Sequence, residues 1–220
     1  MNRHDSRRRW TTALVRLLAC VVLLGLSCGG SDTPTEPDPS QDDPLPDFTL
    51  RDENLNSGTY QDSVSFSDFD GRIVLIYFVY APCAGCRRQL SGLSEVVDSL
   101  HSAFSSGAIS DSVVGFGINH PAAKGDISMI WTEMYTNLPV LQDVLTMIGG
   151  SQVPAVAALL ECGDYSDYFL IVDRERRCVK KTRSCELQSK CGLNLSSPAG
   201  RAQVIDWASE LDSTGAITVP

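Results

Sequence analysis

Residues 72–88 read RIVLIYFVYAPCAGCRR, an apolar run that leads directly into two cysteines separated by two residues. Beyond Arg72 the run is aliphatic and aromatic without polar alternation, which is typical of a strand buried on both faces. From Leu90 to Phe104, apolar residues recur at intervals of three and four, which predicts an amphipathic helix ending near Gly107. The two cysteines are therefore expected where a buried strand passes into a helix.

Further strands and helices are predicted on the C-terminal side of this run. The strands are expected at residues 112–118, 168–173 and 178–182, and the helices at residues 127–138 and from Ser197 to Leu211. Ser197 followed by proline is a typical N-cap and first turn of a helix. This order of elements predicts an α/β layer architecture.

Cys83 and Cys86 carry the chemistry that the sequence suggests. The helical spacing, extended backwards, puts both sulfurs in the first turn of the predicted helix. A thiol attacks as thiolate, and the unpaired amides and dipole at a helix N-terminus stabilise negative charge. We predict that Cys83, next to Pro82 and near Arg87, is the attacking and more exposed thiol. Cys86, one turn further on, is the predicted resolving thiol.

Two other interpretations of this cysteine pair stay open. A pair with this spacing can be half of a zinc site, but classical zinc sites need a second pair at a defined spacing. Cys185 and Cys191 are separated by five residues, and no pair of histidines follows them. The pair can also be a structural disulfide on a non-catalytic domain. We predict a redox pair, with no metal and no cofactor.

The N-terminus indicates export. Residues 1–27 carry five arginines against Asp5, followed by the apolar run Leu17–Leu26, the pattern of a secretory signal peptide. Cys28 after a small residue resembles the lipidation site of bacterial lipoproteins; Cys20 is a rival site, and an ordinary cleaved signal is the alternative. The arginine cluster also resembles a twin-arginine export signal.

The remaining chain divides into a tether, a folded domain and a tail. Residues 28–46 are rich in proline and aspartate and predict a solvated tether, residues 47–214 the domain, and residues 215–220 a tail. The whole chain has a net charge of -9, and its acidic mature part argues against nucleic acid as a partner. The expected location is the bacterial cell envelope, lipid-anchored and facing the periplasm, with the outer membrane among the candidate membranes.

Several segments resemble thioredoxin-like proteins of the redoxin branch. Residues 46–50 and 64–72 resemble the lead-in of peroxiredoxin-like and membrane-tethered disulfide-reductase thioredoxins. Residues 118–120, 138–142, 158–160 and 167–174 are closer to the N-terminal domain of selenoprotein P, whose selenocysteine Cys83 would replace. The resemblance, over residues 46–182, implies a thioredoxin-like fold with a central mixed sheet and helices on both faces, and the pair Cys83–Cys86 at the N-terminus of the first main helix.

The same resemblance implies a function. It suggests a membrane-tethered thiol–disulfide oxidoreductase that acts on a disulfide-containing protein or small molecule and receives electrons from an unidentified donor. A thiol peroxidase is an alternative, although Tyr80 stands where peroxiredoxins carry a threonine, which favours thiol–disulfide exchange over peroxide reduction. A copper-handling thioredoxin-fold protein, using the two cysteines and His120, is another. His120 could also assist protonation, or be a solvated loop residue.

One expected feature of thioredoxins is missing at its usual place. They carry a cis-proline immediately before the strand that faces the two cysteines, whereas Ser166 and Asp167 precede the predicted strand 168–173. Pro154 is the nearby candidate for a displaced cis-proline; otherwise the substrate groove differs.

Four further cysteines form an even set in an exported chain. We predict two structural disulfides, Cys162–Cys178 and Cys185–Cys191, beside the redox pair Cys83–Cys86.

Overall fold

The computed structural model describes residues 43–108, 112–133, 136–162, 167–184 and 192–217, all within the compact unit Pro39–Pro220. Residues 1–27 and Cys28, on which the export prediction depends, lie outside these ranges. Within the described ranges, no helix has both the length and the apolar character needed to cross a membrane.

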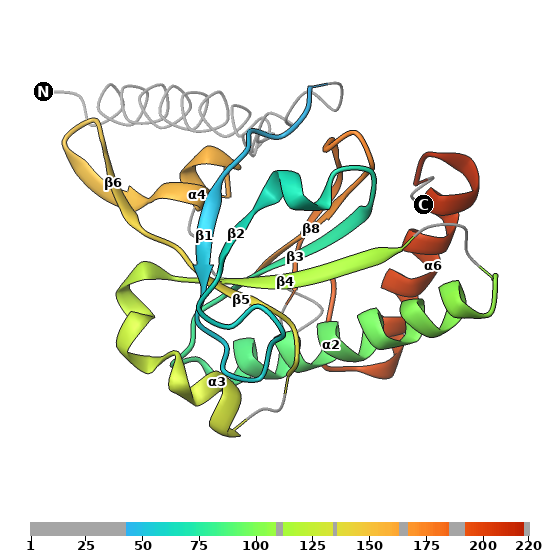
Figure 1. The fold of residues 1–220 in the computed structure, drawn as a ribbon, viewed down its shortest axis with the longest axis horizontal. Helices are drawn as coiled ribbons and strands as arrows, with labels where there is room; N and C mark the ends of the chain where they lie inside the picture. The colour runs from blue at the N-terminus through green and yellow to red at the C-terminus, as the bar shows by residue number, and fades with distance from the viewer. Residues whose placement is uncertain (1–42, 109–111, 134–135, 163–166, 185–191, 218–220) are drawn as a thin grey trace, which may run out of the picture. The chain divides into compact units, whose positions relative to one another are not determined.

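A seven-stranded mixed sheet forms the centre of the fold (Figure 1). Its strands, in spatial order, are β2 (Ser63–Ser65), β1 (Thr49–Asp52), β5 (Val140–Gln142), β4 (Val113–Asn119), β3 (Ile73–Val79), β8 (Tyr168–Val172) and β9 (Cys178–Arg183). β4 runs parallel to both β3 and β5, and the other pairings are antiparallel. A separate hairpin consists of β6 (Leu145–Ile148) and β7 (Ser151–Pro154).

Six helices are described between or after these strands. They are the 3-10 helix η1 (Phe66–Phe69), α2 (Ala84–Ser105), the 3-10 helix η2 (Pro121–Asp126), α3 (Ser128–Glu133), α4 (Ala155–Leu159) and α6 (Pro198–Thr214). Ser197 caps α6, since its side chain accepts a hydrogen bond from the amide of Gly200. Gly215, at φ 73° in the left-handed region, ends that helix.

The central strand β3 is buried on both faces, as predicted. Leu75, Tyr77 and Val79 pack in one core cluster with residues of α2 and α6, which lie together on one side of the sheet (Figure 1). Ile76 and Phe78 pack in the other cluster, which includes residues of η1 and α4. The predicted mixed α/β architecture is confirmed, and both faces of the strand before Cys83 are held by core packing.

The predicted stripe of the long helix holds for four turns and then fails. Cys86, Leu90, Leu93, Val97 and Leu100 are buried. Phe104, which the spacing placed on the same stripe, is 43% exposed near the end of α2. The apolar spacing of the sequence continues to Phe104, but the hydrophobic core does not extend far enough along α2 to bury its ring.

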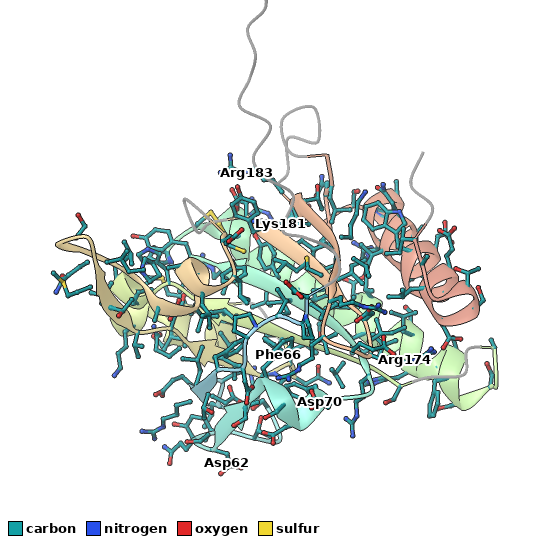
Figure 2. All side chains as sticks on the ribbon, turned by 90° about the horizontal axis from the view of Figure 1, so that it is seen from above. Asp62, Phe66, Asp70, Arg174, Lys181 and Arg183 are labelled. Carbon is teal, nitrogen blue, oxygen red and sulfur yellow. A yellow bond between two sulfur atoms is a disulfide. The ribbon has the colours of Figure 1, made fainter. Side chains whose placement is uncertain are left out.

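The edge strand β9 carries positive charge. Lys181 and Arg183, labelled in Figure 2, both lie over the ring of Tyr168 on the neighbouring strand, at 5.3 and 5.5 Å from the ring centroid. Charged side chains on an edge strand discourage pairing with another chain. Arg183 pairs with Tyr168 at the beginning of β8.

Candidate active site around Cys83 and Cys86

The turn between β3 and α2 is fixed by three hydrogen bonds, of which the two to Ala81 are buried. The amide of Cys83 donates to the carbonyl of Tyr80 at 2.8 Å, and the amide of Ala81 donates to Oδ1 of the buried Asn119 at 3.1 Å. Nη1 of Arg87 donates to the carbonyl of Ala81 at 2.6 Å. Arg87, predicted as an active-site neighbour, thus braces the turn that presents the cysteines.

Cys83 and Cys86 form a disulfide at the start of α2, with 5.2 Å between their Cα atoms. Cys83 is the N-cap, and its sulfur accepts a hydrogen bond from the amide of Cys86 at 3.2 Å. Cys86 is 3% exposed, whereas Cys83 is half-buried and follows the exposed Pro82. The predicted location of the pair at the beginning of the main helix is confirmed, and the order of exposure is the one that the predicted roles require.

Asp167 is the residue that sequence reasoning missed. Its Oδ1 atom lies 3.3 Å from the sulfur of Cys86, and the hydroxyl of Tyr77 donates to the same oxygen at 3.4 Å. In the sequence, Asp167 was visible only as the residue found where thioredoxins have a proline. Its distance of 81 positions from Cys86 gave no sign of a contact.

Burial is the main cause of the shifted pKa values of Asp167 and Tyr77. Burial raises the pKa of Asp167, and the Arg183 guanidinium and the Tyr77 hydroxyl act against that rise. Burial also raises the pKa of Tyr77 well above its usual range, and the neighbouring Asp167 raises it further. The Tyr77 hydroxyl therefore keeps its proton and acts as a donor to the carboxylate.

His120 lies at the end of β4, beside the turn that carries the cysteines. It caps η2, with Nδ1 accepting a hydrogen bond from the amide of Ala122 at 3.1 Å, and its ring meets Tyr80 edge-on at 5.7 Å. Burial lowers the pKa of His120, and the charge of Asp143 acts in the opposite direction. Among the described residues, no three His, Cys, Asp or Glu side chains gather as metal ligands.

Pro154 does not have the geometry that the cis-proline prediction requires. It pairs with Leu145 in the β6–β7 hairpin and is the N-cap of α4, and no cis peptide bond occurs in the described ranges. The prediction fails because Pro154 belongs to this hairpin and α4 follows it, so that Pro154 does not directly precede β8. The residue immediately before β8 is Asp167.

The remaining cysteines are only partly described. Cys162 and Cys178 are both buried in the same core cluster, and the Cys162–Cys178 disulfide stays a prediction. Cys185 and Cys191 lie outside the described residues, as does Cys28.

Comparisons with known proteins agree with this architecture. Residues 42–111 match the AhpC/TSA family. No curated protein matches the chain. A candidate protein disulfide isomerase from Bacteroides thetaiotaomicron is similar at TM-score 0.53 and 16% identity, over 79% of this chain and 90% of that chain.

Two further solved structures are similar at lower TM-scores. A candidate thiol:disulfide interchange protein from Chlorobium tepidum has TM-score 0.48 and 16% identity, with 76% of this chain and 96% of that chain covered. An exposed lipoprotein thioredoxin from Streptococcus pneumoniae has TM-score 0.44 and 20% identity, with 73% and 98% covered. At these identities the similarity concerns the fold alone, and the predicted thioredoxin-like fold is confirmed.

Proposed function

We propose that this chain is an exported, membrane-tethered thiol–disulfide oxidoreductase in which Cys83 attacks and Cys86 resolves. The observation that carries the proposal is the Cys83–Cys86 disulfide at the N-terminus of α2, with Cys83 half-buried and Cys86 only 3% exposed. The resemblance of several segments to selenoprotein P supports this assignment, because it implies that Cys83 takes the place of the reactive selenocysteine.

The chemistry balances as a two-electron exchange. The Cys83 thiolate attacks one sulfur of a substrate disulfide, which forms a Cys83–substrate disulfide and releases the other half of the substrate as a thiolate. Cys86 then attacks the Cys83 sulfur, re-forms the Cys83–Cys86 disulfide and releases the second half. The substrate is reduced to two thiols, and a dithiol donor returns the enzyme to its reduced form.

The helix N-terminus favours the first step. The amide of Cys86, at 3.2 Å, points a donor at the Cys83 sulfur, and the helix dipole adds positive potential at the same place. Both effects stabilise a thiolate relative to a thiol and so increase the reactive fraction at neutral pH. The substrate class that fits is a protein or small molecule with an accessible disulfide.

Turnover by the full-length chain in detergent tests the proposal. With dithiothreitol as donor, the wild type should reduce insulin disulfides or glutathione disulfide, and Cys83→Ser should abolish that activity. A very negative reduction potential of the pair without turnover would mean that the disulfide is structural. Stoichiometric copper binding without turnover would instead favour the copper-handling alternative.

A thiol peroxidase is the second candidate, because residues 42–111 match the AhpC/TSA family. Tyr80 in the place of the peroxiredoxin threonine argues against efficient peroxide reduction. The same assay with hydrogen peroxide as oxidant separates the two functions. Disulfide turnover should exceed peroxide turnover, and comparable rates would favour the peroxidase.

The membrane tether rests on Cys28 and the apolar run before it. We expect the wild type in the membrane fraction of a bacterial host and Cys28→Ser, a matched change of one atom, in the extracytoplasmic soluble fraction. If Cys28→Ser stays in the membrane fraction with the wild type, then lipidation of Cys28 is not what anchors the chain.

A further inference from the structure

The resolving cysteine needs a partner that the proposed function does not by itself supply. Cys86 is 3% exposed and lies in the apolar cluster between α2 and the sheet. Apolar surroundings favour the neutral thiol over the thiolate, yet only the thiolate attacks a disulfide. The amide that stabilises negative charge at this helix terminus is directed at Cys83 instead. A base beside Cys86 would remove this difficulty.

We propose, on the basis of the function above, that Asp167 is a catalytic residue that exchanges a proton with Cys86. Its Oδ1 atom, 3.3 Å from the Cys86 sulfur, is within reach of the thiol proton in the reduced form. The carboxylate takes that proton while the Cys86 sulfur attacks the Cys83 sulfur of the mixed disulfide, and the leaving substrate sulfur departs as thiolate. When a dithiol later reduces the Cys83–Cys86 disulfide, the carboxylic acid returns the proton to Cys86.

The backbone holds Asp167 in place from two strands. Its amide donates to the carbonyl of Phe78 in β3 at 3.2 Å, and its carbonyl accepts from the amide of Ser184, directly after β9, at 2.6 Å. Its φ of 74° lies in the left-handed region, which is unfavourable for a residue other than glycine, asparagine or aspartate. Aspartate is one of these residues, so the two backbone hydrogen bonds can hold it in this conformation.

The side chain of Asp167 is oriented by Tyr77. The Tyr77 hydroxyl donates to the same oxygen that approaches Cys86, and Tyr77 itself is fully buried in β3. Since Tyr77 keeps its proton, it cannot compete for the proton of Cys86. Tyr77 is therefore a positioning residue, and Asp167 is the group in this contact that can accept a proton.

The groups that face Asp167 are Cys86 from α2, Tyr77 from β3 and Arg183 from β9. Burial raises the pKa of Asp167 while Arg183 and Tyr77 oppose the rise. A carboxyl with a raised pKa is closer in basicity to a thiol, which makes proton transfer between them more favourable. The local charges therefore agree with the geometry.

Acid-quenched mixing of the reduced full-length enzyme with glutathione disulfide tests the assignment. Mass analysis measures two steps, the formation of the Cys83–glutathione adduct and its decay as Cys86 resolves it. Asp167→Asn keeps the shape and tolerates the left-handed backbone, but cannot accept the proton. We expect adduct formation within about threefold of wild type and decay about 100-fold slower near pH 7, the lower limit of what a general base typically contributes.

Two controls separate this role from a structural one. Asp70→Asn removes a surface carboxylate that pairs with Arg176 at 3.4 Å, and it should leave both steps unchanged. Tyr77→Phe removes the orienting hydroxyl but retains the base, so it should slow decay less than Asp167→Asn does. Equal decay in Asp167→Asn and wild type would overturn the proposal, whereas a wild type that forms no Cys83 adduct would overturn the proposed function itself.

The wild type alone gives a second test if Asp167→Asn does not fold. With a base of raised pKa, the decay rate should level off over part of the range from about pH 5 to about pH 8. A decay rate that increases tenfold per pH unit across that whole range would show direct ionisation of Cys86 without a base, and would overturn the proposal.

Discussion

The side chain of Asn119 links the turn before Cys83 to neighbouring segments of the fold. Its hydrogen bonds allow the loss of stability in Asn119→Ala to be worked out. The side chain is fully buried. Oδ1 accepts from the amide of Ala81 at 3.1 Å, and Nδ2 donates to the carbonyl of Ala123 at 3.3 Å and to Oε1 of Gln142 at 2.9 Å. Asn119→Ala removes all three hydrogen bonds and leaves three buried partners without this side chain.

The magnitude follows from these contacts. A net hydrogen bond contributes about 1 kcal/mol, so three contribute about 3 kcal/mol, and unsatisfied buried partners increase the loss. For a domain of this size, 1 kcal/mol corresponds to roughly 2–4 °C in Tm. Asn119→Ala should therefore lower the Tm by roughly 6–12 °C. Because Ala81 leads into Cys83, the first step of disulfide exchange should also slow.

Thermal and urea unfolding of the oxidised full-length chain measure the effect. Asn137→Ala is the matched control, since Asn137 is exposed and accepts one hydrogen bond from the hydroxyl of Ser94 at 3.0 Å. That variant should lose less than about 1 kcal/mol. If the Tm of Asn119→Ala fell no further than that of Asn137→Ala, the hydrogen bonds of Asn119 would not hold this turn.

Three other variants test separate parts of the structure. Burial raises the pKa of Asp167 in the folded chain above its pKa in the unfolded chain. Between these two pKa values, ionisation of the carboxyl therefore destabilises the folded state as the pH rises. Asp167→Asn should therefore raise the Tm at pH 7.5 and have little effect below about pH 4, where an unfolded carboxyl is protonated as well; an equal effect at both pH values contradicts this sign. A Cβ on Gly92 would overlap the backbone carbonyl oxygen of Leu195, so Gly92→Ala should destabilise the folded state by about 1–3 kcal/mol, measured by urea unfolding. Gly125→Ala, with open space around it, is the control and should stay close to wild type. Ser197→Ala should reduce the unfolding free energy by about 1 kcal/mol through loss of the α6 N-cap, and an unchanged value would show that the cap is not needed.

The sequence was sufficient to predict a strand or helix where its local apolar pattern matches the residues that the core buries. The apolar run of β3 and the spacing of Leu90, Leu93 and Val97 each report burial directly, so the strand and the following helix were predictable. Ser197 identified the start of α6 for the same reason, because an N-cap is a local interaction.

Short strands were harder to predict. β2 and β5 have three residues each, which is too short for alternation to be visible in the sequence. The β6–β7 hairpin was missed although Gly149 and Gly150, at φ 58° and 83°, are the residues that a tight hairpin turn requires. The two glycines pointed to a turn, but the apolar side chains of β6 are mostly exposed. They do not show the alternation of buried and exposed residues that marks a half-buried strand.

The cysteine pair was predictable, and its neighbour Asp167 was not. The spacing of Cys83 and Cys86 and the helix that follows are adjacent in sequence. The contact with Asp167 depends on the antiparallel pairing of β3 with β8, which brings the residue before β8 to the end of β3 near Tyr77. No local pattern encodes such a contact, and only the sheet order reveals it.

Trapping of the mixed disulfide is the most direct test of the central claim that Cys83 is the attacking thiol and Cys86 the resolving thiol. Reduced full-length Cys86→Ser is mixed with glutathione disulfide, and the adduct is located by peptide mass mapping. A persistent glutathione adduct on Cys83, absent from Cys83→Ser, is the predicted result. No adduct on Cys83, or a faster adduct on Cys86 in the Cys83→Ser variant, would contradict the assigned roles.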